Sequence, residues 1–294
     1  MQLQPCHICA STNLADYMDV KSYKMTKCTD CNHVQVNPIP SEEVLLGLYQ
    51  NGNGDSFYGN SCSVSLLEKS RLDKKFLTKY YSERIDTIND ILSSQTAAVL
   101  DFGCTNGLFV KAITESGYQN AFGYDVAEAL IEEGKENNLN LFTGELNVFS
   151  TSFKNFFDLV LSYHVFEHLA SPRKILTELR ICLKGGGYLY INVPHINSLQ
   201  VRLLKKKSAI IDPPYHLHYF TKKSLIRLLE DQGFEIVKIT TPFWEKSTDT
   251  YLEMMGFGHK AAVILRHIVA PLRGVIRFLC LGGNIAVLAR KKHA

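Results

Sequence analysis

Apolar residues recur in two alternating patterns along the middle of the chain. Short apolar runs, typical of buried strands, alternate with stretches in which apolar residues return every three or four positions, as in amphipathic helices. The sequence predicts strands at 98–102, 120–124, 139–142, 157–162, 188–193, 234–241 and 284–290. It predicts helices at 108–113, 127–137, 172–183 and 222–232, and one or two more between residues 62 and 94. This alternation predicts a doubly wound α/β sheet with helices on both faces.

A glycine turn joins the first predicted strand to the helix that follows it. Asp101 closes the strand, and Gly103 and Gly107 lie in the turn VLDFGCTNG. Glycine permits a positive φ and lets a ligand approach the backbone, and open α/β sheets bind ligands at such turns. About twenty residues later the second strand is followed by Asp125, an acid placed to accept hydrogen bonds from ribose hydroxyls. Glycines at buried turns also serve packing alone, so the turn by itself does not decide between the two roles.

Four motifs in chain order extend this pattern: VLDFGCTNG, GYDVAEALIEEGKE, FDLVLSYHVFEHL and LKGGGYLYINVP. Over residues 96–241 the chain resembles the class I S-adenosylmethionine-dependent methyltransferases. The resemblance implies a Rossmann-like, seven-stranded methyltransferase sheet with S-adenosylmethionine as cofactor. The cofactor-binding residues that we expect are Asp101, Gly103, Cys104, Gly107, Asp125, Val126, Glu145, Ser162 and Tyr163. Thr105 stands where the family's first motif has a glycine, and its Cβ is expected to narrow the approach of the cofactor's methionine part.

Two CxxC pairs lie near the N-terminus, with Cys6 and Cys9 in the first and Cys28 and Cys31 in the second. Their spacing is typical of a zinc ribbon, in which four thiolates form the tetrahedral shell of a structural zinc. Such a closed shell leaves no open coordination position, so we expect Zn²⁺ to stabilise the module and to take no part in the chemistry. A pair of disulfides is the alternative. We expect His33 to be a surface residue of the second pair.

The sequence divides into three regions. We expect a zinc-ribbon module at 1–50, a linker with cofactor-covering helices at 51–95, and the methyltransferase domain at 96–294 with an insertion at 195–220. The leader resembles that of a zinc-binding methyltransferase subgroup that includes sugar and polysaccharide-cluster enzymes, through Tyr49 and the loop holding Tyr58. The sugar enzymes carry a further C-terminal domain for which this chain is too short, so sugar C-methylation is not carried over.

Composition narrows the class of protein. A formal net charge of +3 over 294 residues gives no electrostatic case for binding nucleic acid. The sequence begins without a basic region and apolar core, and no apolar run is long enough to span a membrane. We therefore expect a cytoplasmic protein with reduced or metal-bound cysteines. The apolar, arginine-bearing segment 254–281 predicts a helical cover or a dimer contact, with peripheral membrane contact as the alternative.

Two segments supply candidate catalytic histidines. His164 follows the fourth strand in SYHVFEHL, at the ligand edge of the sheet, and His216 and His218 lie in the insertion, in DPPYHLHYF. The zinc-binding subgroup has H-x-H-Y-F-T at that point. Because an imidazole is suited to accept a substrate proton, His218 is our first candidate base, followed by His216 and His164. Packed core histidines are the alternative.

The stretch SYHVFEHL also suggests a metal site. Quinone-biosynthesis O-methyltransferases have a similar stretch, E-x-x-E-H, that binds a divalent cation. It maps onto His164, Glu167 and His168, with the first acid replaced by histidine. The alternative is that Glu167 and His168 support the local turn while His164 lines the cofactor pocket.

Together these features predict an S-adenosylmethionine-dependent methyltransferase that acts on a small hydroxylated acceptor. Our first choice of acceptor is a sugar or glycan intermediate, such as a nucleotide-linked sugar, whose negative charge would engage the lysines at 205–207. The alternatives are a quinone-type O-methyltransferase, an RNA methyltransferase, and a degenerate methyltransferase-fold binding module that Thr105 has disabled. The oligomeric state is not indicated.

Overall fold

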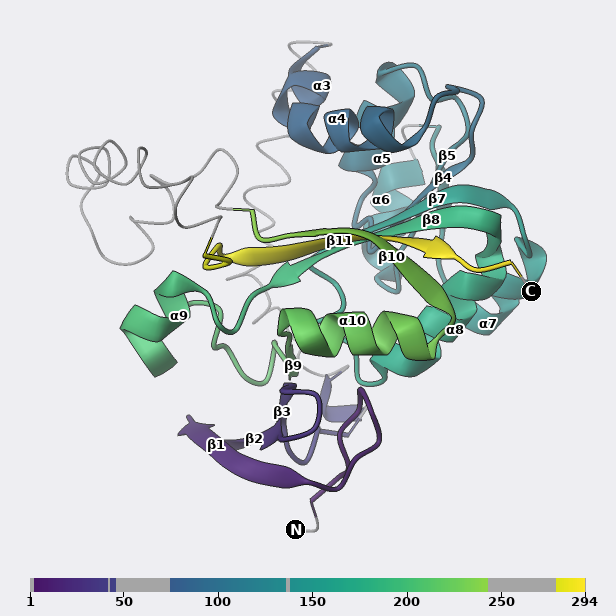
Figure 1. The fold of residues 1–294 in the computed structure, drawn as a ribbon. Coiled ribbons are helices and arrows are strands. Elements are labelled where there is room, and N and C mark those ends of the chain that lie inside the picture. Colours follow the sequence, from purple (N-terminus) through teal and green to yellow (C-terminus); the bar gives the residue numbers. More distant parts are fainter. Residues whose placement is uncertain (1–2, 42, 46–74, 136–137, 243–278, 294) are drawn as a thin grey trace, which may run out of the picture. The chain divides into compact units, whose positions relative to one another are not determined.

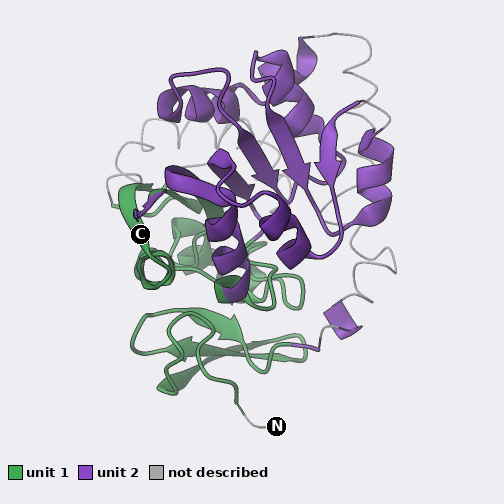
Figure 2. Ribbon diagram, turned by 90° about the vertical axis from the view of Figure 1, so that its right-hand side faces the viewer, with its two compact units in different colours: residues 1–39, 166–173, 191–289 green, residues 40–165, 174–190, 290–294 purple. Residues whose placement is uncertain are grey.

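The structure, a computed structural model, describes residues 3–41, 43–45, 75–135, 138–242 and 279–293. The chain forms two compact units (Figure 2). Unit 1 comprises residues 1–39, 166–173 and 191–289, and unit 2 comprises residues 40–165, 174–190 and 290–294. The N-terminal module shares unit 1 with much later parts of the chain.

The predicted seven-stranded sheet is present, in the order β10-β11-β8-β7-β4-β5-β6 (Figure 1). Its strands are β4 (Val99–Phe102), β5 (Ala121–Tyr124), β6 (Asn140–Phe142), β7 (Phe157–Tyr163), β8 (Leu183–Pro194), β10 (Phe234–Thr240) and β11 (Asn284–Lys291). Strand β4 pairs in parallel with both β5 and β7, and β5 pairs in parallel with β6. The expected α/β fold class is therefore confirmed, and the carboxyl ends of β4, β5 and β7 meet at one edge of the sheet.

Every predicted helix that falls on described residues is present. These helices are α3 (Phe76–Tyr80), α4 (Ser82–Ile91), α5 (Leu108–Glu115), α6 (Glu128–Lys135), α8 (Pro172–Cys182) and α10 (Lys222–Asp231). The pattern did not predict α7 (Leu146–Ser152), α9 (Leu199–Leu204) or the 3-10 turn η2 (Lys205–Lys207). Tyr49, Tyr58 and most of the segment 254–281 lie outside the described residues. Within the described ranges, no helix has both the length and the apolar character needed to cross a membrane.

The core of unit 2 anchors both sides of the glycine turn. All four residues of β4 are buried, and so are five of the first six residues of α5. Leu77 of α3 and Ile85 and Ile88 of α4 join the same cluster, so the helices that precede the first strand contribute to this core. Burying apolar surface on every side of the turn fixes where it stands.

Unit 1 contains a second sheet, here called the ribbon sheet, which the sequence did not predict. Its order is β1-β2-β3-β9, built from β1 (Leu14–Val20), β2 (Tyr23–Cys28), β3 (Val34–Val36) and β9 (His218–Tyr219). Strand β9 comes from the predicted insertion and pairs antiparallel with β3. Apolar residues of the insertion also join the apolar cluster of this sheet, where Ile196, Val201 and Ile210 lie with Met25 and Val34. The segment 195–220 therefore completes the ribbon sheet.

Candidate functional site

The glycine turn after β4 has the left-handed backbone that the sequence predicts. Gly103 and Gly107 have φ values of +87° and +80°. A Cβ on Gly103 would also collide with the side chain of Val165, so only glycine fits there. The amide groups of Gly103 and Cys104 donate to the carbonyl of Tyr124 at 2.8 and 3.2 Å, which joins the turn to the end of β5.

Thr105 keeps the left-handed backbone although it is not glycine. Its φ is +51°, a conformation that costs a residue with a Cβ roughly 1–2 kcal/mol. Its hydroxyl donates to the carbonyl of Cys104 at 2.7 Å, and its amide donates to Oδ2 of Asp125 at 2.9 Å. The departure from the family motif therefore leaves the backbone of the turn in place.

Asp125, Val126 and Glu145 lie where the second and third strands of the motif region end. The Asp125 carboxylate accepts hydrogen bonds from the amides of Thr105 and Ala127, both at 2.9 Å. The side chain of Val126 is 78% exposed although it is apolar, and Glu145 is exposed after β6. An anchored carboxylate beside an exposed apolar side chain suits the ribose and the base of a nucleoside. These residues fit the nucleoside part of S-adenosylmethionine.

Arg84 is a charged residue near the glycine turn that sequence reasoning did not single out. The guanidinium carbon of Arg84 lies 4.2 Å from the ring centroid of Tyr163 and 5.3 Å from that of Phe109. Burial raises the pKa of Asp101 to about 7, while the positive charge of Arg84 opposes this rise and the negative charge of Asp125 adds to it. A cation and a buried acid thus lie close to the glycine turn. One arginine in an amphipathic helix gives no sequence signal that separates this role from a solvated face.

The remaining expected cofactor residues of unit 2 differ in their surroundings. The side chain of Cys104 is buried in the core, so what it can offer a ligand is its backbone. The hydroxyl of Ser162 is buried and, among the described residues, has no hydrogen-bond partner. Tyr163 ends β7, and its ring contacts the rings of Phe109 and Tyr190. Ser162 and Tyr163 therefore lie at the carboxyl end of the strand next to β4, as predicted.

The three candidate catalytic histidines fall in different units. His164 follows β7 in unit 2 with a φ of +56°, and it is half-buried. His216 and His218 belong to unit 1 and are 3% and 1% exposed. The structure thus places one of the three in the unit that carries the glycine turn.

His218 is packed inside the ribbon sheet. Its Nδ1 lies 2.9 Å from Nε2 of His33, and the two rings stack. Burial, together with the nearby His33 and His7, holds the pKa of His218 well below its usual range. The expectation that His33 lies at the surface is wrong: it is wholly buried, and burial followed by the charge of His7 lowers its pKa to about 3. The buried pair is neutral near pH 7.

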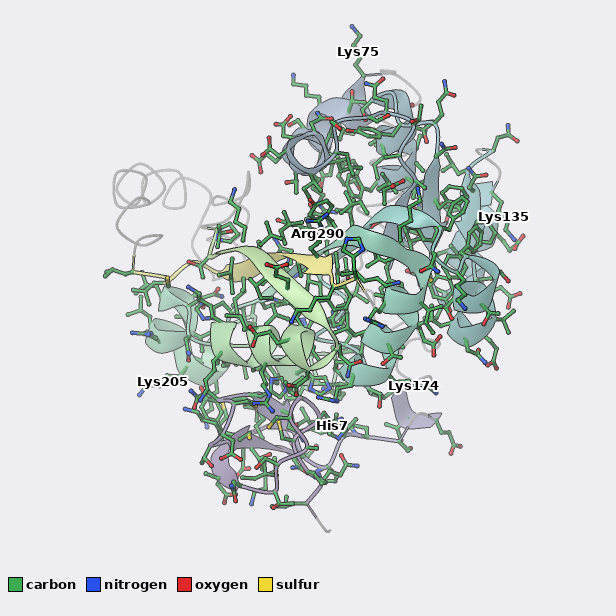
Figure 3. All side chains as sticks on the ribbon, turned by 45° about the vertical axis from the view of Figure 1, so that its right-hand side comes forward. His7, Lys75, Lys135, Lys174, Lys205 and Arg290 are labelled. Atoms are coloured by element: carbon green, nitrogen blue, oxygen red, sulfur yellow. The ribbon has the colours of Figure 1, made fainter. Side chains whose placement is uncertain are left out.

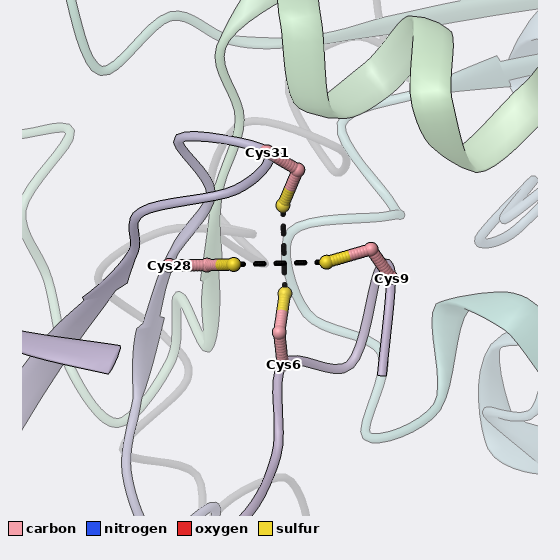
Figure 4. Close-up of side chains that lie close together, drawn as sticks. All are labelled: Cys6, Cys9, Cys28 and Cys31. Carbon is pink, nitrogen blue, oxygen red and sulfur yellow. Dashed lines mark hydrogen bonds between the residues drawn. The ribbon is translucent and has the colours of Figure 1, made fainter. Parts of the chain in front are cut away.

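The four cysteines of the CxxC pairs converge in unit 1 (Figure 4). Sγ of Cys6 lies 3.6 Å from Sγ of Cys31, and Sγ of Cys9 lies 3.6 Å from Sγ of Cys28. All four are free thiols, so the disulfide alternative is not formed. With zinc–sulfur bonds of about 2.3 Å, a tetrahedral shell has sulfurs about 3.8 Å apart. The donor set and its spacing fit a structural zinc, which these four residues would hold.

The basic cluster of the insertion is exposed to solvent. Lys205, Lys206 and Lys207 form the turn η2 at the end of α9, and Figure 3 labels the first of them. Their use by an anionic acceptor stays a prediction.

Residues 74–239 match a family of methyltransferase domains. The chain belongs to this family, whose matched region includes the glycine turn, Asp125 and the strands β4 to β8. The match begins after the four cysteines, so the ribbon module lies outside it.

Curated relatives are similar over part of the chain. The chain is 27% identical over 175 residues to malonyl-[acyl-carrier protein] O-methyltransferase 2 of Coxiella burnetii, covering 56% of this chain and 66% of that protein. It is 27% identical over 212 residues to tRNA U34 carboxymethyltransferase of Helicobacter acinonychis, covering 66% of this chain and 80% of that protein. It is 25% identical over 162 residues to the mitochondrial ubiquinone biosynthesis O-methyltransferase of Dictyostelium discoideum, covering 48% of this chain and 49% of that protein. The chain thus spans between half and four fifths of these proteins.

A solved structure supports the fold. The structure of a SAM-dependent methyltransferase from Archaeoglobus fulgidus superposes with a TM-score of 0.52 at 23% identity, covering 73% of this chain and 94% of that one. The class I methyltransferase fold that the motifs implied is therefore shown.

Proposed function

We propose that this chain is an S-adenosylmethionine-dependent methyltransferase that acts on the hydroxyl group of a small acceptor. The observation that carries the proposal is the position of Asp125. Its carboxylate is fixed by two backbone amides at the end of β5, beside the left-handed turn and the exposed Val126. Two ribose hydroxyls donating to one carboxylate and a base lying on an apolar side chain are the interactions that this arrangement suits.

The other charged groups of unit 2 complement the methionine part of the cofactor. The cofactor carries a carboxylate and an ammonium group, and its sulfonium supplies a methyl group with a neutral thioether as the leaving group. Arg84 would pair with the carboxylate and Asp101 with the ammonium group. The protein then has to hold the acceptor oxygen in line with the methyl carbon and to exclude water.

His164 is the base that we put first, because it lies at the end of β7 in the same unit as the cofactor residues. As the acceptor oxygen bonds to the methyl carbon, the hydroxyl proton would pass to the imidazole. His218 was our first candidate from sequence. Its burial against His33 favours the alternative of a packed core histidine, and its role as a base stays a prediction.

A sugar or glycan intermediate stays our proposed acceptor within this class. The resemblance of the cysteine-containing leader and the exposed lysines at 205–207 support it. The relatives reported above are named for an acyl-carrier protein, a tRNA and a quinone pathway, so these alternatives belong in the same assay. Purified protein given labelled S-adenosylmethionine and separate pools of nucleotide sugars, phenolic quinone precursors and tRNA would show which pool accepts the label.

Calorimetric titration with S-adenosylmethionine tests the cofactor site. Replacing Asp125 with alanine removes an acceptor of charge-assisted hydrogen bonds. We expect a loss of about 3 kcal/mol, or more than 100-fold in affinity. Asp90→Ala, at an exposed position of α4, is the matched control and should bind as the wild type does. Unchanged affinity in Asp125→Ala would contradict the assignment, and no binding by the wild type would favour a degenerate module.

The base is tested by His164→Ala. General-base catalysis contributes about 10²–10⁴-fold, so kcat should fall by that factor while the affinity for S-adenosylmethionine stays unchanged. His293→Ala, at an exposed histidine near the C-terminus, is the control. If the His164→Ala enzyme kept wild-type turnover, His164 would not be the base, and His218 and His216 would again be the first candidates for that role.

A further inference from the structure

A second group of metal-type ligands lies in unit 1. Glu167, His168 and His216 each offer one ligand atom, and these atoms all lie within 4.8 Å of one another. Glu167 and His216 are 1% and 3% exposed, and the side chain of His168 is 10% exposed. Nε2 of His168 lies 3.9 Å from Oε1 of Glu167, and the two imidazole rings meet edge to face with centroids 4.8 Å apart.

Both imidazoles are oriented by backbone carbonyl groups. Nδ1 of His168 lies 2.8 Å from the carbonyl oxygen of Tyr215, and Nδ1 of His216 lies 2.8 Å from that of Ile210. A carbonyl oxygen only accepts, so Nδ1 carries the proton in each ring. In the neutral ring Nε2 then holds the lone pair. Metal-binding histidines show this same arrangement, in which an outer partner fixes the tautomer and the direction of the ring.

The two segments that supply these ligands are joined by their backbones. The carbonyl of Glu167 accepts hydrogen bonds from the amides of Leu217 and His218, at 2.8 and 3.0 Å. Leu217 in turn offers its carbonyl to the amide of Val36 at 2.9 Å, and its side chain is wholly buried. Glu167 and His216 are thus held side by side by bonds that do not depend on an ion. The site is prearranged.

The chemistry of this group suits a divalent transition metal. Two imidazoles and one carboxylate suit ions such as Zn²⁺, whereas Mg²⁺ and Ca²⁺ prefer oxygen alone. With bonds of about 2.1 Å, tetrahedral ligands lie about 3.4 Å apart, so Nε2 of His168 and Oε1 of Glu167, now 3.9 Å apart, need to approach by roughly 0.5 Å.

We propose that Glu167, His168 and His216 bind Zn²⁺ in a site separate from the four cysteines. The stretch SYHVFEHL suggested His164 as the third ligand. Among the described residues, however, the third member of the group is His216. Three protein ligands leave a coordination position for water or for an oxygen of a small ligand, whereas the cysteine shell is closed. His216 is then a metal ligand. The proposal does not depend on the methyltransferase activity.

Metal counting on the full chain tests the proposal. Protein stripped of metal and reloaded with Zn²⁺ should hold two ions per chain after removal of excess metal. Glu167→Gln, which keeps the shape of the side chain, and His216→Ala should each hold one. His293→Ala, which removes an exposed histidine outside the group, should hold two. A wild type that holds one ion, or variants that hold two, would overturn the proposal.

Loading with Co²⁺ tells the two sites apart and reports on folding. The cysteine site gives sulfur-to-metal charge-transfer bands, whereas a site of nitrogen and oxygen ligands gives only weaker d–d bands. Wild type should show both sets as Co²⁺ is added. Glu167→Gln should keep the sulfur bands, which shows an intact ribbon, and lose the second set. If the wild type shows only the sulfur bands at saturation, the second site does not exist.

Discussion

The glycine turn of unit 2 and the ribbon sheet of unit 1 are built in opposite ways. Asp101, Gly103 and Asp125 lie within 25 consecutive residues, and two neighbouring parallel strands bring them together. The ribbon sheet instead joins β3 to β9, and the hydrogen-bonded His33 and His218 are 185 positions apart. The first region is assembled from local sequence, whereas the second combines a long-range strand pairing with the four-cysteine cluster. Each prediction below addresses one side of this difference.

Removing zinc should have the largest effect. Structural zinc contributes on the order of 10 kcal/mol to the folding of small modules. Chelation, or Cys9→Ala, should therefore abolish hydrogen-exchange protection in β2 and β3, including the amide of Val36, which donates to the carbonyl of Leu217. The amides of β4, β5 and β7 should keep their protection.

The matched control for this experiment is Cys280→Ala. Cys280 lies in the same unit but outside the four-cysteine cluster. Its substitution should leave the exchange of β2 and β3 unchanged. If Cys9→Ala also left these residues protected, the ribbon sheet would be stable without metal and the dependence proposed here would be wrong.

Much of unit 2 was predictable because its signals are local. Buried strands and amphipathic helices each have a characteristic spacing of apolar residues that is visible in the sequence. The left-handed turn needs glycine at Gly103 and Gly107. The cysteine cluster was predictable for the same reason, since two fixed spacings identify it. The short helices α7 and α9 were missed because their seven and six residues give too little periodicity to separate them from loops.

The partners of β9 were not predictable. A two-residue strand has no pattern of its own, and nothing in HLHYF indicates that His218 lies against His33. The position of His216 beside Glu167 was hidden in the same way, because backbone bonds between distant segments create it. Arg84 was hidden by its ordinary helical context. Residues whose role depends on a distant partner are thus the ones that the sequence did not assign.

The pH dependence of cofactor binding tests whether Asp101 must ionise when the cofactor binds. Burial raises the pKa of Asp101 from its ordinary 3.8 to about 7, with Arg84 opposing the rise and Asp125 adding to it. Binding a ligand ammonium group favours the ionised acid, so binding below pH 7 must release a proton. We expect the affinity for S-adenosylmethionine to rise about tenfold from pH 6 to pH 8. Asp101→Asn should show a flat profile by calorimetry.

The raised pKa of Asp101 also predicts the direction in which folding stability changes with pH. Between about pH 4 and 7 the folded protein keeps a proton on Asp101 that the unfolded chain has lost. Stability without cofactor should therefore fall as pH rises through this window, and Asp101→Asn should reduce the fall. A melting temperature whose pH dependence is the same in both proteins would show that the acid is not perturbed.

Thr105→Gly should have the smallest effect, and it tests whether the side chain of residue 105 limits cofactor binding at the glycine turn. Relief of the strained φ is worth about 1–2 kcal/mol, but the greater freedom of glycine in the unfolded chain offsets about half of it or more, so the melting temperature should change little. If the Cβ narrows the cofactor's approach, affinity for S-adenosylmethionine should rise severalfold, by about 1 kcal/mol. Thr105→Ala is the control, because it keeps the Cβ and loses only the hydroxyl that bonds to Cys104. Equal affinity in all three proteins would mean that residue 105 faces away from the cofactor, and that the departure from the family motif has no consequence for binding.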